Sequence, residues 1–367
     1  MLGSWKRLVL RGLLGLVIVM IVAVVGALGY RAWRQHETAV ALAIHTPNGV
    51  QEATYVRLGG IDQWVQIRGE NRDNPVILFV HGGPGESEAP FSAVFRPWEK
   101  DFTVVMWDQR CAGKTFARNG KQSCVGMSIA SVAQEGVALT EFLRNRLHKH
   151  KVIVVGISWG SMVGLRMAHD RPDLYSAYVG TGQVVSIAEK EAVNYASAME
   201  RVRAAHDDAG VRALQAVGPP PYQSASGLFV ERNWSRRHDI PAERDLLWKF
   251  VPVGLVAPGW SLWDVYEYIQ AAKYAEAATF DADASYDARA LGTKFAEPVF
   301  IFNGALDRVT PASLAKSYFD QLEAPQKAFV ALDNAGHDAA LTEPDVFLRE
   351  LVTRVRPIAV QADGPSQ

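Results

Sequence analysis

Short runs of apolar residues recur along most of the chain and predict the strands of a sheet. They are residues 75–80 (PVILFV), 102–107 (FTVVMW), 151–155 (KVIVV), 177–179, 298–302 (PVFIF) and 327–332 (KAFVAL). Apolar runs without a polar residue at every second position are typical of parallel strands buried on both faces. Residues 53–57 and 61–68 instead flank Gly59-Gly60 and predict a β-hairpin.

Helical patterns separate these runs. Between the second and third runs, apolar residues recur every three or four positions from Ile129 to Leu147, which predicts a helix with one side packed on the sheet. Alternating strands and helices predict an α/β fold, in which functional groups collect at the carboxyl ends of the strands. We expect this core in two parts, residues 50–182 and 288–358.

Residues 183–287 interrupt the alternation. They contain amphipathic helical patterns, a stiff GPPPY break at 218–222 and the aromatic-rich WSLWDVYEYI at 260–269, but no run comparable to the strands. We expect a helical cap over the sheet. The aromatic residues either form the core of this cap or contact a substrate.

The N-terminal segment differs from the rest in composition. Residues 12–30 carry no charge and, as a helix, would span about 28 Å, which is enough to cross a bilayer. We therefore expect a membrane anchor within residues 1–35. A signal segment cleaved near 27–29 (ALG), which would release a secreted protein, is the alternative. The flanking basic residues weakly favour an N-terminus in the cytoplasm and a main domain outside it; they are Lys6, Arg7, Arg11, Arg31 and Arg34.

Charge and cysteine content narrow the possible partners. With 38 basic and 39 acidic residues, the net charge of -1 provides no basic excess to attract nucleic acid. The chain has 2 cysteines, Cys111 and Cys124. They are too few for a cysteine-based metal site, and their spacing alone does not decide whether they form a disulfide. We expect neither a metal nor an organic cofactor.

Candidate chemistry begins with Ser158 in VVGISWGSMVG (154–164). This serine follows a predicted strand, precedes a predicted helix and has Gly156 and Gly160 two positions away on either side. Such a strand–turn–helix is typical of a nucleophile elbow, where larger side chains at the glycine positions would collide. A lone G-x-S-x-G is weak evidence, because a serine that caps a helix produces the same pattern.

A glycine-rich segment, HGGPG at 81–85, follows the run that ends at Val80. Glycines allow backbone N–H groups to approach a substrate oxygen closely. We expect the N–H groups of Gly83 and Trp159 to form an oxyanion hole. A turn without a catalytic role is the alternative.

Two further residues complete a candidate catalytic triad. Asp307 (in NGALDRVTP) and His337 (in NAGHD) each follow a predicted strand. The chain order serine, acid, histidine is that of α/β-hydrolases. We predict that Ser158 is the nucleophile, His337 the general base and acid, and Asp307 the group that orients His337. Asp333 or Asp338 could serve as the acid instead.

Taken together, these motifs resemble those of one enzyme family. HGGPG, WDQR (107–110), GISWGS (156–161), GALDRVTP and AGH are similar to motifs of the prolyl aminopeptidases, or proline iminopeptidases, which are serine peptidases of the α/β-hydrolase superfamily. The resemblance extends from Ala53 to Pro357. It implies release of an N-terminal residue from a small peptide, with acidic cap residues holding the free imino group. Glu189 and Glu191, on the first cap helix, are the candidates, although carboxylates on such a helix are often simply solvated.

Two departures from the family keep other functions open. Cys111 stands where the family has glycine after DQR, so the turn is either altered or tied to Cys124. Ordinary cytosolic members also lack the N-terminal apolar segment. A membrane-anchored carboxylesterase or lipase-like enzyme acting on small acyl substrates is therefore an alternative. A non-catalytic α/β-hydrolase scaffold that binds ligands is a more remote one.

Overall fold

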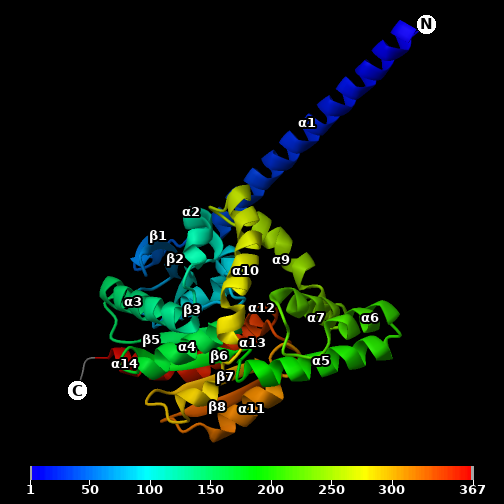
Figure 1. Ribbon diagram of the computed structural model, residues 1–367. Coiled ribbons are helices and arrows are strands. Elements are labelled where there is room, and N and C mark those ends of the chain that lie inside the picture. Colours follow the sequence, from blue (N-terminus) through cyan, green and yellow to red (C-terminus); the bar gives the residue numbers. More distant parts are fainter. Residues whose placement is uncertain (1, 365–367) are drawn as a thin grey trace.

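A computed structural model describes residues 2–364 and centres on an 8-stranded sheet in the order β1-β2-β4-β3-β5-β6-β7-β8 (Figure 1). Strand β2 is antiparallel to both of its neighbours, and the strands from β4 to β8 are parallel. The strands are β1 (Val50–Leu58), β2 (Ile61–Gly69), β3 (Val76–Val80), β4 (Thr103–Asp108), β5 (Val152–Ile157), β6 (Tyr175–Thr181), β7 (Val299–Gly304) and β8 (Lys327–Leu332). The predicted hairpin and the predicted parallel sheet are both confirmed.

The continuous apolar runs are explained by helices on both faces of the sheet. In β3, alternate side chains point to opposite faces: Leu78 packs in one apolar cluster, and Ile77 and Phe79 pack in another. The first cluster is completed by α3 (Ile129–Leu147), α4 (Trp159–Asp170) and α11 (Ala312–Gln321). The second is completed by η1 (Ala89–Lys100), α12 (Ala339–Thr342), α13 (Pro344–Glu350), η4 (Leu351–Val355) and α14 (Arg356–Asp363).

Strand β8 differs from the expectation of burial on both faces. Leu332 is its one buried residue, while Lys327 and Ala331 are exposed. The reason is its position, because β8 pairs with β7 at the edge of the sheet. An apolar run thus predicted the strand correctly but not its burial.

The chain between β6 and β7 is helical, as the sequence predicts. Its elements are α5 (Ile187–Ala204), α6 (Asp208–Val217), α7 (Ala225–Arg237), α8 (Pro241–Arg244), α9 (Leu246–Leu255), α10 (Leu262–Asp283) and η3 (Ala288–Leu291). Part of this region has a small apolar cluster of its own, formed by residues such as Ala198, Val202 and Leu214. Two short elements, α2 (Gly113–Asn119) and η2 (Gly120–Cys124), contact α10.

Helix α1 (Leu2–Ala41) projects away from the rest of the molecule as one continuous helix (Figure 1). Within residues 2–364 it is the one helix that is long and apolar enough to cross a membrane. A signal sequence has the same properties, so length and composition fit either of the two roles predicted for this segment.

Candidate active site

Ser158 lies in the sharp turn between β5 and α4, with φ +50° and ψ −120°. A methyl group on Gly156 would lie 2.7 Å from the carbonyl oxygen of Gly160, and one on Gly160 would overlap the carbonyl oxygen of Val80. Both positions therefore require glycine, for the steric reason that the sequence pattern suggests. The left-handed backbone of Ser158 is unusual for a residue with a side chain and is typical of a functional turn.

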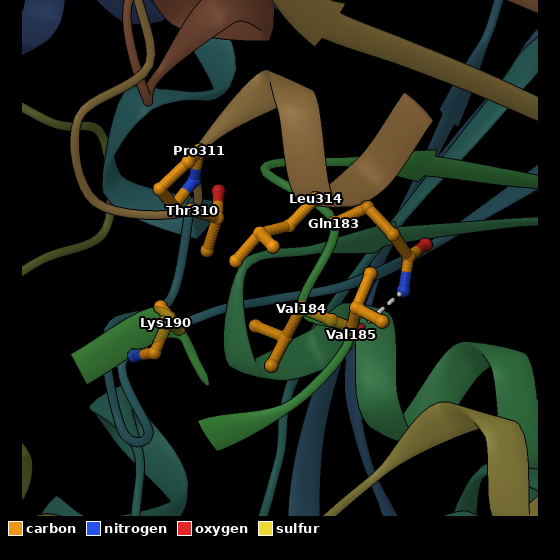
Figure 2. A pocket seen from close by; sticks show the side chains of 7 residues that line it. All are labelled: Gln183, Val184, Val185, Lys190, Thr310, Pro311 and Leu314. Carbon is orange, nitrogen blue, oxygen red and sulfur yellow. Dashed lines mark hydrogen bonds between the residues drawn. The ribbon is translucent and has the colours of Figure 1, made fainter. Parts of the chain in front are cut away.

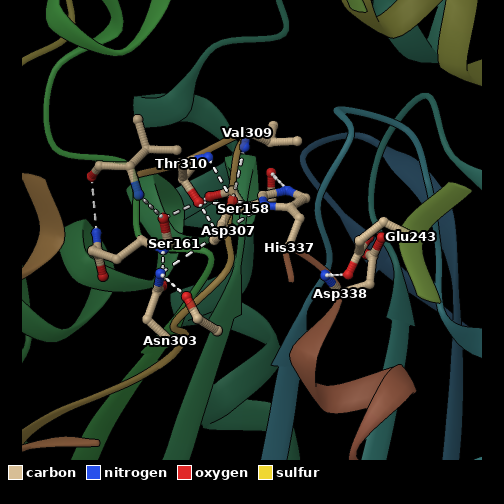
Figure 3. A network of polar contacts seen from close by, with 12 residues as sticks. Ser158, Ser161, Glu243, Asn303, Asp307, Val309, Thr310, His337 and Asp338 are labelled. Atoms are coloured by element: carbon tan, nitrogen blue, oxygen red, sulfur yellow. Dashed lines mark hydrogen bonds and ion pairs between the residues drawn. The ribbon is translucent and has the colours of Figure 1, made fainter. Parts of the chain in front are cut away.

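The structure brings Ser158, His337 and Asp307 together at the carboxyl ends of β5, β8 and β7 (Figure 3). His337 Nε2 lies 2.9 Å from Ser158 Oγ. Its Nδ1 lies 3.2 and 3.1 Å from the two carboxylate oxygens of Asp307. Of the three aspartates considered from the sequence, Asp307 is thus the one in contact with the imidazole. Asp333 is exposed, and the backbone N–H of Asp338 donates to Glu243 instead.

The carboxylate of Asp307 is held by several donors. It accepts hydrogen bonds from the backbone N–H groups of Val309 and Thr310, both at 2.8 Å, and from the Thr310 hydroxyl at 2.6 Å. Burial acts to raise the pKa of Asp307, but the charge of His337 and these hydrogen bonds outweigh it, so the pKa is lowered. Asp307 is therefore fixed in both position and charge.

The pKa of His337 is shifted in the opposite direction. Burial acts to lower it, but Asp307, and then Asp338 and Glu243, raise it to about 9. The imidazole of the free protein is therefore mostly protonated at neutral pH. It must lose that proton before it can accept one from Ser158.

The HGGPG segment lies beside Ser158. A methyl group on Gly82 would be 3.0 Å from Ser158 Cβ. The segment is held by His81, whose Nδ1 donates to the Gly82 carbonyl at 2.9 Å and whose Nε2 accepts from Gln109 N–H at 3.2 Å. Burial lowers the pKa of His81 to about 4, which keeps the ring neutral. Gly83 is the next residue along this segment, so its role as an oxyanion donor stays a prediction.

Trp159 begins helix α4, and its side chain connects the turn that holds Ser158 to α10. Its backbone N–H belongs to the first helical turn, where amides have no acceptor within the helix. Its indole N–H donates to Asp283 of α10 at 2.6 Å. A methyl group on Gly85 would lie 2.9 Å from Ala275 of the same helix. Helix α10 therefore packs against both segments proposed for the oxyanion hole.

The turn after WDQR contains a disulfide between Cys111 and Cys124. Cys111 has φ +58°, the left-handed conformation that glycine adopts most easily. The turn thus keeps a glycine-like backbone although the residue is cysteine, and it is tied to Cys124, as one of the two expectations had it.

The two cap carboxylates predicted to bind an amine occupy different environments. Glu189 forms an ion pair with Arg289, and its side chain is 43% exposed. Glu191 is buried and pairs with Lys190 at 2.9 Å and with Arg232 at 2.7 Å. The structure therefore does not bring Glu189 to the triad, and it surrounds Glu191 with cations from its own chain.

Two cap carboxylates escaped the sequence analysis. Glu243 of α8 accepts a hydrogen bond from the N–H of Asp338, the residue after His337, at 3.2 Å (Figure 3). Burial, and then the charge of Asp338, raise the pKa of Glu243. Glu231 of α7 is fully buried, and burial raises its pKa too. Neither position has a sequence signal, because both look like ordinary charged residues of amphipathic helices.

Two hollows in the structure do not explain substrate binding. A crevice between α5 and the start of α11, lined by Val184, Lys190 and Thr310 among others, is too narrow to admit a water molecule (Figure 2). A cavity of about 280 Å³ lies between the end of α1, the β1–β2 hairpin and residues 257–259. Within residues 2–364, no cluster of His, Cys, Asp or Glu suits a metal ion.

Comparison with known proteins agrees with this architecture. The model of a family described as "alpha/beta hydrolase fold" matches residues 75–344. The probable aminopeptidase YbaC of Bacillus subtilis (strain 168) is 25% identical over 308 residues, which cover 82% of this chain and 94% of that protein. A probable proline iminopeptidase of Streptomyces coelicolor is 34% identical over 115 residues, 31% of this chain and 34% of that protein.

Among solved structures, a bacterial membrane phospholipase A superposes with a TM-score of 0.61 at 15% sequence identity. The match covers 95% of this chain and 98% of the other. At this identity the likeness concerns the fold alone.

Proposed function

Because this chain belongs to the α/β hydrolase fold family, we propose that it is a serine hydrolase in which Ser158 is the nucleophile, His337 the general base and acid, and Asp307 the orienting carboxylate. The 2.9 Å contact between His337 Nε2 and Ser158 Oγ, with Asp307 on the other ring nitrogen, is the observation that carries the proposal.

The reaction then proceeds in two halves. His337 takes the proton of Ser158 as its oxygen attacks the carbonyl carbon of the substrate, and the resulting oxyanion accepts hydrogen bonds from the N–H groups of Gly83 and Trp159. His337 gives the proton to the leaving group, which leaves an acyl-enzyme. Water, deprotonated by His337, then releases the acyl group and restores Ser158.

We further propose that the substrate is a peptide with a free N-terminus, as in an aminopeptidase of the prolyl aminopeptidase type. Two observations support this. A relative that matches 82% of the chain is named a probable aminopeptidase. In addition, the charge of Asp338, the residue after His337, acts to raise the pKa of His337, and negative charge at this position favours a cationic amine close to the scissile bond.

A second candidate is a membrane-anchored carboxylesterase or lipase-like enzyme. The cations Lys190 and Arg232 already neutralise Glu191, which weakens the case for that residue as an amine ligand. Apolar cap residues approach the HGGPG segment, since a methyl group on Gly85 would lie 2.9 Å from Ala275, and the Tyr268 hydroxyl donates to the Ser87 carbonyl at 3.2 Å. Such surroundings suit an acyl chain.

We also propose that residues 1–35 anchor the protein in a membrane through α1, with the catalytic domain on the extracytoplasmic side. The length and apolar surface of α1 support the anchor. In this scheme residues 50–182 and 288–358 form the catalytic core, and residues 183–287 form the cap.

A fluorophosphonate probe, which reacts with activated serines, tests the catalytic proposal. We expect the wild type and the exposed-site control Ser317→Ala to be labelled, and Ser158→Ala not to be labelled. Labelling of Ser158→Ala at the wild-type level would contradict the assignment. A folded wild type that takes no label would favour a non-catalytic binding module.

Turnover of a prolyl-anilide and of short acyl esters separates the two substrate classes. We expect kcat/KM to be higher for the anilide. A clear preference for the esters would replace the aminopeptidase proposal with the carboxylesterase proposal and leave the role of Ser158 unchanged.

A further inference from the structure

The end of α1 is hydrogen-bonded to the cap. The Arg31 guanidinium donates to the carbonyl of Leu255 at 2.9 Å and to that of Trp260 at 2.6 Å. One turn later, the Gln35 amide donates to the carbonyls of Ala257, at 2.9 Å, and Trp260, at 2.8 Å. The α9–α10 loop is therefore fixed to α1 one residue beyond the uncharged stretch 12–30.

Aromatic side chains mark the same end of this stretch. Tyr30 and Trp33 are 61% and 54% exposed, and their ring centroids are 5.7 Å apart. Tyrosine and tryptophan are enriched where a membrane-spanning helix leaves the hydrocarbon layer, because their rings are apolar and carry a polar group. These two residues therefore locate the membrane surface at the level of the α9–α10 loop.

The cap exposes large apolar side chains on the two helices that this loop connects. We call them the α9–α10 patch: Trp248, Val251, Leu255, Leu262, Trp263, Tyr266 and Ile269. Trp248 is 83% exposed and Trp263 is 60% exposed. Large apolar side chains that are exposed on neighbouring elements are typical of an interaction site on a protein.

We propose that the α9–α10 patch lies in the interfacial layer of the lipid bilayer that α1 crosses. The occupant is the bilayer because the loop between α9 and α10 is bound to the anchor at the point where the anchor leaves the hydrocarbon. Tryptophan and tyrosine in the patch suit the headgroup boundary. This inference rests on the proposed anchoring by α1 but not on the identity of the substrate.

Contacts between aromatic rings link α9 and α10 to the segment that follows HGGPG. Phe250, on α9, packs against Phe91 with ring centroids 5.5 Å apart, and Phe91 packs against Tyr268 at 6.4 Å. Tyr268 in turn donates to the carbonyl of Ser87, two residues after the HGGPG segment. These contacts connect α9 and α10 to the segment that lies beside Ser158.

Site-specific fluorescence on the full-length chain tests the proposal. The native cysteines form a buried disulfide, so a cysteine introduced at an exposed position is the reactive one. Trp248→Cys and Trp263→Cys would each be labelled with an environment-sensitive fluorophore and reconstituted into phosphatidylcholine vesicles that contain nitroxide-labelled lipid. Val22→Cys reports on the anchor. Lys316→Cys, on α11 at the end of the molecule opposite α1, is the matched exposed control (Figure 1).

We expect nitroxide lipid to quench the probes at 22, 248 and 263 several-fold more than the probe at 316. If the probe at 22 is quenched while those at 248 and 263 behave like the control, the docking proposal is wrong and the anchor stands. If the probe at 22 is not quenched, the anchoring premise fails instead. Shielding of 248 and 263 that grows with the protein-to-lipid ratio, without nitroxide quenching, would identify a second copy of the chain as the occupant and overturn the proposal.

Each variant that carries a fluorophore should still react with the fluorophosphonate probe, which verifies that it is folded.

Discussion

Asp307, the acid of the proposed triad, and the acids Glu191 and Glu231 inside the cap are all buried, yet they are held in different ways. Asp307 accepts hydrogen bonds from two backbone N–H groups and a hydroxyl in addition to its contact with His337. Glu231 lies 3.4 Å from Arg232, and neither of its carboxylate oxygens makes a hydrogen bond within the part of the chain that the structure describes.

This difference separates a preorganised site from an adaptable one. Hydrogen bonds from the backbone fix the direction of a carboxylate, whereas an ion pair between side chains fixes mainly the charge. Burying a carboxylate without hydrogen bonds is costly. We infer that the core is built to hold one geometry and that the cap retains charged groups able to rearrange around a substrate.

The largest expected effect comes from replacing Asp307, the acid that backbone hydrogen bonds hold in place. In Asp307→Asn, an amide can donate to His337 Nδ1 and favour the wrong tautomer, so we expect kcat to fall by about 10³–10⁴-fold. Steady-state kinetics would measure the fall, with the exposed Asp333→Asn as the control. A fall of less than tenfold would mean that Asp338 or another group orients the imidazole.

Next in size is a matched pair of substitutions in the cap. In Glu191→Gln, Lys190 and Arg232 lose a buried partner, so we expect the free energy of unfolding to fall by about 3 kcal/mol. In Glu231→Gln we expect a change within about 1 kcal/mol, because the replaced carboxylate makes no hydrogen bond. Denaturant unfolding in detergent micelles would measure both changes.

The same pair tests the role of the cap. If the cap carboxylates hold a substrate amine, Glu231→Gln should raise KM for the prolyl-anilide about tenfold and leave ester turnover unchanged. Equal destabilisation by the two substitutions would mean that the close ion pairs of Glu191 stabilise the cap no more than the carboxylate of Glu231 does.

The smallest expected effect concerns the influence of the cap residue Glu243 on the pKa of His337. Because its pKa is raised to about 9, the neutral imidazole that catalysis needs becomes populated as the pH rises, and kcat/KM should increase through the alkaline range to a plateau. Glu243→Gln removes one of the negative charges that raise this pKa, so the midpoint should move to lower pH by less than about one unit. A pH–rate profile would measure the shift. An unchanged midpoint would mean that the cap does not influence His337 electrostatically.

The core was predictable because its constraints are local. Gly156, Ser158 and Gly160 are needed by one turn, and the aspartate and histidine each follow their own strand, so the pattern can be read without knowing what packs where. The apolar runs also predicted the strands. They could not predict that β8 lies at the edge, because strand order depends on contacts between distant segments.

The cap could be predicted as helices but not as a site. Glu189 and Glu191 are two positions apart, yet one pairs with Arg289 at the surface and the other is buried beside Arg232. Which face of a helix is covered depends on neighbouring helices, and the sequence of α5 does not specify them. Glu243 was missed for the same reason, since its importance lies in its contact with Asp338, which is distant in the chain.

Trp159 connects two regions of the molecule. Its backbone belongs to the turn that follows Ser158, and its indole N–H donates a hydrogen bond to Asp283 of the cap. Any opening that lifts α10 away from the sheet must either break this bond or pull on the turn that holds Ser158. Movement of α10 and the position of the Trp159 backbone N–H, which we propose as an oxyanion donor, are therefore linked, so that under the proposed function a closed cap and a competent Ser158 go together.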